Sequence, residues 1–581
     1  MSNEQKRVDE FNLVAAGAAG QGIETLSVIL GKVLLRGGWH VFALQDKESR
    51  IRGGHNFFHM RISGKPVGSA AMPLDLVIAL TEESIELHRR DLADTGIILY
   101  DSQKGRLPEG EKHHSVGLPF EQIATEAGGS RIYGNSVAAG AAMAIMGLEI
   151  SELESFLKSF FSGKDDAGEK NGQAARAGFE RGLKLSEGFR RKNLTPNGRA
   201  RRMFITGHEA VSVGAVAAGC RFFSAYPMSP STAILTFLAE HGEPFDMVVE
   251  QTEDEISAIN MAIGASYGGV RAMTATSGGG FSLMVEGFGL AAISETPLVV
   301  VEGQRPGPAT GLPTRTEQGD LLFVLHASQG EFPRFIFAPA TPGEAFSLTI
   351  KAFNLAEKYQ VPAVILTDEF LADCYFTEER FDPSSVRIER HLLSKEEAGK
   401  LKEYRRYALT ESGVSPRSVP SAFGFEVTAD SHEHDEWGHI TEDPVMRKEM
   451  TDKRFRKTGG METEISPPRV MGDPKANLLL VSWGSTLHAV SEAIEILNGE
   501  GVRVKGVHFS ELWPFPKKHA EDAFKGIKKW AVVENNSTAQ FARVMAMELG
   551  RKADGMILKY TGRAFMASEI VEGFKKEVLG S

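Results

Sequence analysis

Short apolar runs alternate with amphipathic segments along most of the chain. Phe11–Gly17 is apolar and strand-like, Ile23–Leu35 carries apolar residues at helical spacing, and Val41–Leu44 is again strand-like. The alternation returns later in the apolar runs Leu298–Val301 and Val361–Leu366. Strands that alternate with helices are typical of parallel sheets covered by helices, so the pattern predicts an α/β fold with parallel sheets.

Breaks in this alternation predict three α/β domains. The stretch after Gly182 is rich in Arg and Lys and contains Pro196 and Gly198, as linkers often do. A second polar and irregular stretch follows Pro383. We predict a first domain over residues 1–185, a linker over 186–202, a second domain over 203–382, a connector over 383–473 and a third domain over 474–581.

Composition removes several classes of protein. Of the 581 residues, 42% are hydrophobic and 24% are charged, which is ordinary for globular chains and excludes a disordered or coiled-coil protein. The formal net charge is -11 and no long basic run occurs, so we expect no nucleic acid partner. The first ten residues lack the apolar core of a signal peptide, and the longest apolar stretch, Val137–Leu148, is short of the ~20 residues that span a bilayer. We therefore expect a soluble, cytoplasmic protein with no membrane partner.

Cysteine usage limits the metal chemistry of the chain. The two cysteines, Cys220 and Cys374, could not supply the thiolates of an iron–sulfur cluster or of a structural zinc site. His432, His434 and His439 could suggest a metal, but they lie in the polar connector. We predict no metal site in this chain.

A first glycine cluster follows the first predicted strand. Gly17, Gly20 and Gly22 precede a helix, and Asp46 follows the next strand, which is the context of a dinucleotide fingerprint. Their spacing is G-x-x-G-x-G rather than G-x-G-x-x-G, so a tight turn explains them as well as a nucleotide does. Arg52, beside two glycines, could grip an anionic substrate or stand in solvent.

The second predicted domain carries more specific patterns. In the segment that begins Tyr226-Pro227, two prolines flank Met228-Ser229 and fix the direction of the Ser229 hydroxyl, which suits a hydrogen bond to a substrate. Ser231 could instead be the N-cap of a helix near Ala233.

Acidic residues crowd the segment Glu250–Glu255. Four carboxylates in six residues would ordinarily form a solvated helix start. Glu255 lies closest to the apolar helical stretch Ile256–Ala265, so we expect it to be buried and able to share or shuttle a proton.

Two further segments add a turn and a pair of arginines. Ser277, Gly278 and Gly279 end a strand in a glycine turn, where backbone can pack against a flat ligand or simply turn. Arg305 and Arg315 lie in a loop stiffened by prolines and glycines, where a guanidinium could grip a carboxylate.

In four segments the chain resembles the alpha subunit of the 2-oxoacid:ferredoxin oxidoreductases. They are Y-P-M-S-P-S-T from Tyr226, E-Q-T-E-D-E from Glu250, T-S-G-G-G-F-S-L-M from Thr276 and G-L-P-T-R-T-E-Q-G-D-L from Gly311, in that order and spacing. Residues 1 to about 182 resemble the gamma subunit of these enzymes, fused at the N-terminus. The resemblance implies a Rossmann-like gamma domain, a thiamine-diphosphate pyrimidine-binding domain and a transketolase C-terminal-like domain. It is nearest to the two-subunit type associated with 2-oxoglutarate.

Site residues follow from the resemblance. It implies that Glu255 contacts the aminopyrimidine ring of thiamine diphosphate, with Tyr226, Pro227 and the turn Ser277–Gly279 beside the cofactor. Ser229 stands where the family usually has Thr. Arg315 stands where the substrate-carboxylate arginine is expected, with Arg305 as the alternative. Departures from the family pattern are His208, Gly279 and Ala309, where Asn, Pro and Ser are usual.

The chain lacks parts that the reaction needs. It has no G-D-G motif followed by a downstream Asn to hold magnesium and the diphosphate, and no cysteine set for a cluster. The resemblance therefore implies a separate beta subunit that carries Mg and a 4Fe-4S cluster, in a dimer of heterodimers. The complex would oxidise a 2-oxoacid, best 2-oxoglutarate, to an acyl-CoA and reduce ferredoxin. Alternatives are an indolepyruvate- or branched-chain-type oxidoreductase subunit, a non-catalytic scaffold subunit and a nicotinamide dehydrogenase.

Overall fold

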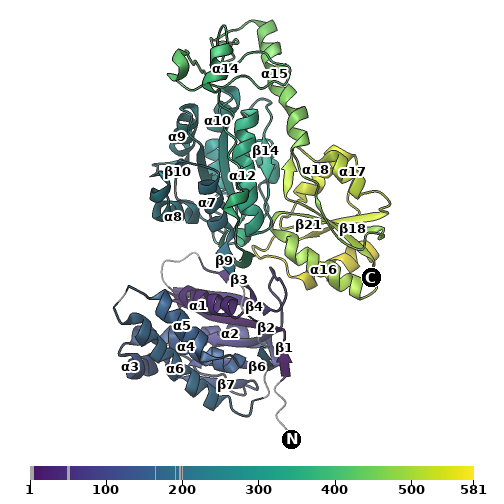
Figure 1. The fold of residues 1–581 in the computed structure, drawn as a ribbon. Coiled ribbons are helices and arrows are strands. Elements are labelled where there is room, and N and C mark those ends of the chain that lie inside the picture. The colour runs from purple at the N-terminus through teal and green to yellow at the C-terminus, as the bar shows by residue number, and fades with distance from the viewer. Residues whose placement is uncertain are drawn as a thin grey trace. The chain divides into compact units, whose positions relative to one another are not determined.

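The computed structural model describes residues 6–48, 53–163, 165–189, 192–194, 198 and 201–580 (Figure 1). These residues divide into two compact units. The first contains the chain up to residue 205 and a returning segment, 373–380, and the second contains 206–372 and the chain from 381 onward. Helices alternate with strands in both units, so the predicted α/β class is confirmed.

The first unit is built on a mixed sheet, which has eight strands in the described residues. They are β2 (Glu10–Ala19), β3 (His40–Asp46), β4 (Gly53–Ser63), β5 (Leu74–Ala79), β6 (Leu92–Asp101), β7 (His114–Leu118), β9 (Arg202–Thr206) and β16 (Tyr375–Glu379). Their order across the sheet is β7-β6-β5-β2-β4-β3-β16-β9. A separate small sheet joins β1 (Lys6–Val8) to β8 (Lys192–Leu194).

Strand β4 breaks the parallel arrangement that the alternation predicts. It runs antiparallel to both β2 and β3 and separates them, and β16 returns antiparallel to β3. The chain between Asp46 and Gly53 is too short for the crossover of roughly a dozen residues that parallel strands need. The prediction of a parallel sheet therefore holds for β2, β5, β6 and β7 and is wrong for β3 and β4.

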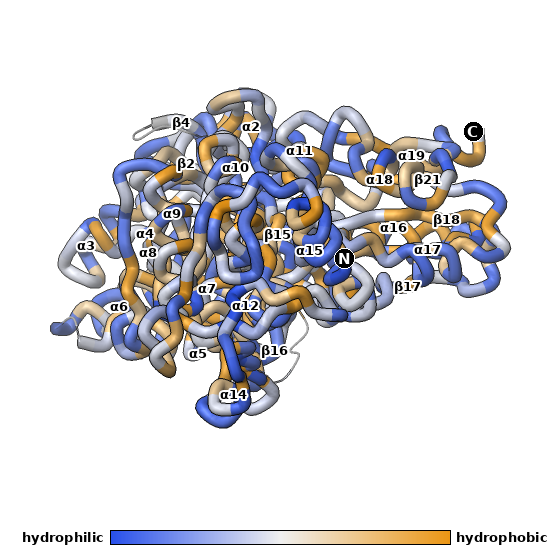
Figure 2. The backbone as a smooth tube through the Cα atoms, turned by 90° about the horizontal axis from the view of Figure 1, so that it is seen from above, coloured by the Kyte–Doolittle hydropathy of each residue, from blue (hydrophilic) through white to orange (hydrophobic). Residues whose placement is uncertain are grey.

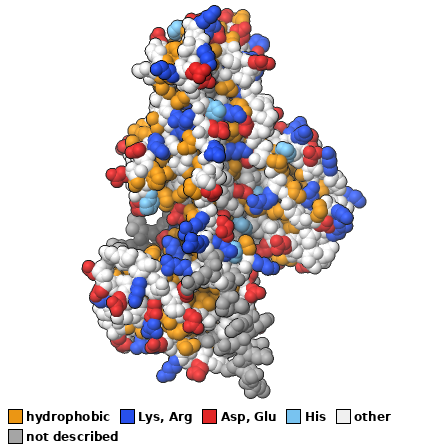
Figure 3. Space-filling model, viewed as in Figure 1, with side chains coloured by type: hydrophobic (Ala, Val, Ile, Leu, Met, Phe, Trp, Pro, Cys, Tyr) orange, Lys and Arg blue, Asp and Glu red, His pale blue; other side chains and the backbone are white. Residues whose placement is uncertain are grey.

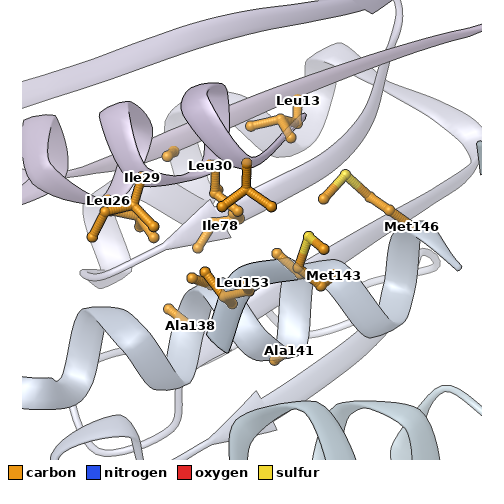
Figure 4. Close-up of a cluster of buried hydrophobic side chains, with 14 of the residues drawn as sticks. Leu13, Leu26, Ile29, Leu30, Ile78, Ala138, Ala141, Met143, Met146 and Leu153 are labelled. Atoms are coloured by element: carbon orange, nitrogen blue, oxygen red, sulfur yellow. The ribbon is translucent and has the colours of Figure 1, made fainter. Parts of the chain in front are cut away.

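Buried apolar residues cover both faces of this sheet. The helices are α1 (Ile23–Arg36), α2 (Glu82–His88), α3 (Phe120–Gly128), α4 (Gly134–Met146), α5 (Ile150–Phe160) and α6 (Ala167–Leu185). Figure 4 shows Leu30 of α1 near Met143 of α4 and Leu153 of α5, over the face of the sheet that carries Leu13. Because successive strand residues point to opposite faces, Val14 joins a second cluster, on the other face, with α2.

The second unit contains a sheet with seven strands in the described residues. They are β10 (Phe222–Ala225), β11 (Val248–Gln251), β12 (Ala272–Thr276), β13 (Leu298–Gln304), β14 (Phe335–Phe337), β15 (Pro362–Asp368) and β20 (Glu511–Trp513), in the order β11-β10-β12-β13-β15-β14-β20. All are parallel except β20, which runs antiparallel to β14. The helices that pack with it are α7 (Gly207–Ala217), α8 (Thr232–His241), α9 (Glu255–Tyr267), α10 (Gly278–Ile293), α11 (Leu321–Leu325) and α12 (Pro342–Tyr359).

The C-terminal region adds a sheet of five strands in the described residues. They are β17 (Arg469–Gly472), β18 (Leu478–Trp483), β19 (Val504–Phe509), β21 (Lys529–Glu534) and β22 (Gly555–Leu558), in the order β17-β19-β18-β21-β22. The helices around it are α16 (Leu487–Gly499), α17 (Lys517–Ala523), α18 (Gln540–Leu549) and α19 (Ala567–Phe574). Residues of α18 share one buried cluster with α9 and α10, whereas α16 and α19 pack over a separate cluster. The two sheets of this unit therefore share a core.

A buried ionic cluster attaches the polar segment 383–473 to the rest of the second unit. It contains α14 (Lys395–Lys400) and α15 (Pro444–Thr463). Lys453 and Lys457 of α15 each lie 2.5 Å from a carboxylate oxygen of the fully buried Glu295. Burial raises the pKa of Glu295, but the two ammonium groups outweigh it and hold that pKa well below its usual range. Lys453 and Lys457 are thus buried charges, and removing one member of the cluster would leave an unpaired charge in the protein interior.

The hydropathy of the chain follows the arrangement of strands and connections. In Figure 2 the strands β15, β18 and β21 carry hydrophobic stretches while the surrounding connections are mostly hydrophilic. Lys and Arg side chains lie among Asp and Glu side chains over most of the face visible in Figure 3. Among the described residues, every helix is too short or too polar to cross a bilayer.

Helices α4 and α6 touch backbone to backbone, which generates a prediction. A Cβ atom on Gly140 would lie 1.9 Å from the carbonyl oxygen of Ala175, and one on Gly178 would lie 2.1 Å from that of Val137. We expect Gly140→Ala to lower the free energy of unfolding by about 1–3 kcal/mol, because the clash is with backbone and cannot relax by a side-chain rotation. Thermal unfolding of the full chain followed by circular dichroism checks this.

Gly172 of α6 provides the matched control. A Cβ there meets no atom within 4 Å, so Gly172→Ala should be neutral or stabilise by up to about 1 kcal/mol, as helix propensity dictates. Equal melting temperatures for the two variants would contradict the close packing of α4 on α6.

Candidate active site

The carboxyl ends of β12, β13 and β15 meet at one edge of the parallel sheet in the second unit. Their registers align Thr276 with Glu302 and Gln304 with Asp368. Chain segments that leave parallel strands at their carboxyl ends form the usual ligand-binding edge of such sheets. The predicted glycine turn and the predicted arginine loop both start here.

The glycine turn at the start of α10 is enclosed by carboxyl groups. A Cβ on Gly280 would lie 2.0 Å from Thr276 Oγ1 and 2.6 Å from Glu255 Oε1. A Cβ on Gly278 would lie 2.6 Å from Asp320 Oδ2. A side chain at either position would therefore displace an acidic side chain or the Thr276 hydroxyl, because these groups lie against the turn from two directions.

Glu255 is the first residue of α9 and its side chain is buried. The preceding residue, Asp254, caps the helix by accepting a hydrogen bond from Ser257 N (2.7 Å). Glu255 is only 3% exposed, so its predicted burial is confirmed. Within the described residues, its Oε1 atom has no hydrogen-bond donor. A buried carboxyl oxygen without a partner is costly unless a ligand supplies one.

The segment that begins with Tyr226 borders the same edge of the sheet. Ser231 Oγ donates to the carbonyl oxygen of Thr276 (2.5 Å). Ser231 is the N-cap of α8 by position, as predicted, but its hydroxyl makes no capping bond to the helix. Ser229 is exposed, and its carbonyl oxygen accepts a hydrogen bond from Arg305 Nη1 (2.7 Å).

The two predicted arginines occupy different parts of the same loop. Arg305 directly follows β13 and contacts Ser229. Arg315 donates a hydrogen bond from Nη1 to Thr314 O (3.2 Å). It also packs along Gly562 of the C-terminal region, because a Cβ atom added to Gly562 would lie 3.0 Å from the Cβ atom of Arg315. The structure thus brings Arg305, Ser229 and the glycine turn together at one edge. Arg52 lies outside the described residues.

The C-terminal region fixes the far end of this loop through Gln318. The Gln318 amide nitrogen donates to Trp483 O (2.9 Å), and its backbone nitrogen donates to Asn535 O (2.7 Å). Asn535 N and Asn536 Nδ2 donate back to Gln318 oxygens, at 2.9 and 3.0 Å. Trp483 and the Asn535-Asn536 pair therefore support the loop that carries the arginines.

Sequence reasoning missed a cluster of carboxyls at this edge. The buried Glu302 and Asp368 lie there with the partly buried Asp320. Burial and the Asp320 carboxyl raise the pKa of Glu302 well above its usual range. Burial raises the pKa of Asp320, and also that of Asp368, to about 6. The available signal was a glutamate at the end of an otherwise apolar strand, which is uncommon in a buried parallel strand.

The first glycine cluster lines a separate cavity in the first unit. Gly20, Gln21 and Gly22 border a cavity of about 970 Å³, and Asn135 Nδ2 donates to Gln21 O (2.9 Å) and Gly22 O (3.1 Å). Because β4 separates β2 from β3, Asp46 does not end a parallel neighbour of β2. The arrangement is therefore not the βαβ unit on which a dinucleotide fingerprint depends.

The three connector histidines have separate partners. His432 contacts Asp430, His434 packs on the ring of Tyr407, and His439 lies 3.7 Å from Asp435. Among the described residues, no group of three or more His, Cys, Asp or Glu side chains is placed to hold a metal ion.

Comparison with protein-family models matches three parts of the chain. Residues 213–452 match "Pyruvate flavodoxin/ferredoxin oxidoreductase, thiamine diP-bdg", residues 12–181 match "Pyruvate ferredoxin/flavodoxin oxidoreductase", and residues 476–570 match "Pyruvate:ferredoxin oxidoreductase core domain II".

Similar proteins span nearly the whole chain. The 2-oxoacid:ferredoxin oxidoreductase 2, subunit alpha, of Aeropyrum pernix is 32% identical over 98% of this chain and 97% of its own length. The 2-oxoglutarate synthase subunit KorA of Methanothermobacter marburgensis is 33% identical over 63% of this chain and 97% of its own length. The structure of 2-oxoglutarate:ferredoxin oxidoreductase from Magnetococcus marinus, with 2-oxoglutarate, coenzyme A and succinyl-CoA bound, superposes with a TM-score of 0.91 and 30% identity, covering 98% of this chain and 100% of that one.

The enclosed glycine turn generates a second prediction. Gly280→Ala should lower the free energy of unfolding by about 1–3 kcal/mol, since the new methyl group would displace the Thr276 hydroxyl or the Glu255 carboxyl. Gly279→Ala is the control, because a Cβ there meets its nearest atoms at 3.9 Å and should change stability by no more than about 0.5 kcal/mol. Chemical unfolding of both variants checks this; an unchanged midpoint for Gly280→Ala would show that the turn is looser than described.

Proposed function

The chain belongs to the 2-oxoacid:ferredoxin oxidoreductase family, as an alpha subunit with a gamma-like N-terminal region, and we propose that it catalyses, with a partner, CoA-dependent oxidation of a 2-oxoacid. The best candidate substrate is 2-oxoglutarate, because that acid is named for the similar Methanothermobacter subunit and the superposed Magnetococcus enzyme. The products would be an acyl-CoA, carbon dioxide and reduced ferredoxin.

One observation carries the proposal: the buried Glu255 carboxyl, with its unpartnered Oε1, beside the turn Gly278–Gly280. A flat heteroaromatic ring needs close approach to backbone, which the glycines allow, and a hydrogen-bond partner for a ring nitrogen, which Glu255 offers. These residues fit the aminopyrimidine half of thiamine diphosphate. When bound, that cofactor supplies the electron sink needed to cleave the bond between the carboxylate and the carbonyl carbon of a 2-oxoacid.

The chain's own residues would bind and orient the reactants. Glu255 would hold the ring and keep or move a proton at Oε1. The exposed Ser229 hydroxyl would donate to the substrate's carbonyl or carboxylate oxygen. Arg305, held beside Ser229 by its bond to the Ser229 carbonyl oxygen, would present its remaining donors to the substrate carboxylate.

A separate beta subunit would complete the site. Cys220 and Cys374 are the two cysteines of the sequence and both are buried, so this chain could not supply the thiolates of a 4Fe-4S cluster. Large apolar side chains also stand exposed on the elements that carry the site, as expected of a surface that a partner covers. They are Tyr226 (40%), Ile256 (49%), Met261 (41%), Leu283 (50%) and Leu312 (49%). We propose that the partner supplies Mg, the diphosphate site and the cluster, in a dimer of heterodimers.

The function is tested by a substrate panel. The chain would be co-expressed with its neighbouring gene and purified anoxically, and CoA-dependent viologen reduction measured with 2-oxoglutarate, pyruvate, branched-chain oxoacids and indolepyruvate. We expect 2-oxoglutarate to give the highest kcat/KM. A different leading acid would change the substrate, and no reduction by a cluster-bearing complex would favour a scaffold role.

Glu255→Ala serves as the matched variant in this assay. Loss of the proton-transferring carboxyl should lower kcat by at least about 10²-fold while the complex still co-purifies. Near-normal turnover would remove Glu255 from the reaction.

The two arginines make a further prediction. Arg305→Ala should raise the KM for 2-oxoglutarate by about ten- to hundredfold, since a charge-assisted hydrogen bond to the carboxylate is lost. Arg315→Ala should raise it less, because Arg315 packs along Gly562 rather than beside Ser229. Steady-state kinetics of both variants shows which arginine binds the substrate carboxylate. A larger increase in KM for Arg315→Ala would assign that role to Arg315 instead of Arg305.

A further inference from the structure

Two carboxyl groups lie close together behind the glycine turn. Glu302 belongs to β13 and is 0% exposed, and the partly buried Asp320 directly precedes α11. Each carboxyl shifts the pKa of the other, as expected of neighbouring acids. Among the described residues, neither Glu302 oxygen nor Asp320 Oδ2 has a hydrogen-bond donor. Two ionised carboxylates only accept hydrogen bonds, so these oxygens are satisfied only when one acid carries a proton that the other accepts.

The surroundings place that proton on Glu302. Burial and the neighbouring Asp320 carboxyl raise the pKa of Glu302 well above its usual range. Asp320 Oδ2 instead lies against Gly278, at the N-terminus of α10, where the helix dipole favours an anion. The protonated Glu302 therefore donates to the Asp320 carboxylate.

Backbone contacts hold the pair in place. Asp320 N donates to Gln304 Oε1 (3.0 Å), and Gln304 Nε2 donates to Thr367 O (3.1 Å) on the neighbouring strand β15. Glu302 and Gln304 alternate with the intervening Gly303 on β13, so both side chains point to the same face of the sheet. The pair is thus built into the edge of the sheet.

Arg305 connects this pair to the substrate side. Its positive charge favours the ionised forms of both Glu302 and Asp320 and so opposes the rise of their pKa values. The same guanidinium donates a hydrogen bond to the carbonyl oxygen of Ser229. Arg305 therefore interacts both with the two acids and with the segment proposed to contact the substrate.

We propose that Glu302 and Asp320 act as a proton-sharing positioning pair that sets how much of the Arg305 charge is available to an anionic 2-oxoacid. The proposal rests on the proposed function, in which Arg305 receives the substrate carboxylate. Neither acid contacts the substrate; both act through Arg305 and through the turn at Gly278.

Other charged groups face the pair from the elements packed around it. Asp368, at the end of β15, accepts hydrogen bonds from Ser485 Oγ and from Leu371 N (3.0 Å), so its oxygens already have partners. Glu317 lies near Asp320 on the arginine loop. Glu255 lies across the glycine turn. Arg305 is the cation among these groups.

The sign of the effect follows from the charges. While Glu302 keeps its proton, the pair carries a single negative charge and Arg305 can still attract a carboxylate. When the pH rises and Glu302 ionises, the pair carries two negative charges, which neutralise Arg305 and repel the substrate. The KM for the oxoacid should therefore rise with pH, by up to about tenfold per pH unit for one linked proton.

The test compares the pH dependence of KM and kcat in the assembled complex. Buried glutamates are known to titrate at about pH 8–9, so the KM for 2-oxoglutarate is measured from about pH 6.5 to pH 9.5. Glu302→Gln keeps the shape of the side chain and donates an N–H to Asp320, but it cannot ionise. We expect its KM to stay within about twofold over the range in which the KM of the unmodified complex rises, with a smaller difference in kcat.

Asp320→Asn is the second variant, and it guards against a folding defect in the first. It removes the negative charge beside Arg305, so KM should fall below that of the unmodified complex at neutral pH. Asp368→Asn is the matched control, since Asp368 is buried at the same edge but its oxygens already have partners. The KM of this variant should still rise with pH, with the rise beginning at a lower pH because the Asp368 charge helps to raise the pKa of Glu302.

The outcomes separate the proposals. If the unmodified complex oxidises no 2-oxoacid, the proposed function fails. If it does, and Glu302→Gln retains the rise of KM with pH or merely lowers the melting temperature and kcat equally at every pH, the pair is structural and the inference is overturned.

Discussion

The site depends on the enclosure of the turn Gly278–Gly280 by acidic side chains. Glu255 lies against it from α9 and Asp320 from the loop before α11, so that a side chain on Gly280 or Gly278 would displace one of these acids. Acidic groups are tolerated around a helix start because the backbone N–H groups of α10 provide a positive end. In the proposed site, a flat, polar ring would approach the backbone of this turn between the two carboxyls, so the turn would determine where the ring binds.

The rest of the second unit keeps these carboxyls in position. Parallel strands bring their ends to one edge, and the hydroxyl of Ser231 ties the adjoining segment to the Thr276 carbonyl oxygen. Gln318 joins the arginine loop to the C-terminal region through hydrogen bonds with Trp483 and Asn535. The C-terminal region therefore helps to shape the proposed site, because the loop that carries the arginines would lose its fixed end without it.

Local patterns predicted the elements and the turn, but they could not predict which distant groups meet. The burial of Glu255 followed from its position next to an apolar helix, and the glycine turn followed from a strand that ends in Ser277. Strand β4 was missed as an antiparallel neighbour, and β16 was missed as a strand returning to the first unit, because pairing between distant segments leaves no periodic signal. Glu302 directly follows the predicted apolar run Leu298–Val301 and received no predicted role, because only the structure brings the Asp320 carboxyl beside it. Gln318 likewise acquires its role from residues far along the chain.

A site for an anionic substrate that is lined by carboxyls poses an electrostatic problem, and the structure suggests how it is solved. Three acidic groups, Glu302, Asp320 and Asp368, lie at one edge with Arg305 as their cation. If all three were ionised, their negative charge would exceed the single positive charge of Arg305. They would then repel a substrate carboxylate, and this repulsion is stronger in a low-dielectric site than in water. A proton shared by Glu302 and Asp320 lowers the negative charge of this cluster. Asp368 accepts hydrogen bonds from a hydroxyl and a backbone N–H, which stabilise its carboxylate. The three side chains still fill the volume behind the turn. The shape and the charge of the proposed site are then set separately. The acidic side chains fill the volume behind the glycine turn, and their protonation determines how much of the positive charge of Arg305 remains available to a substrate carboxylate.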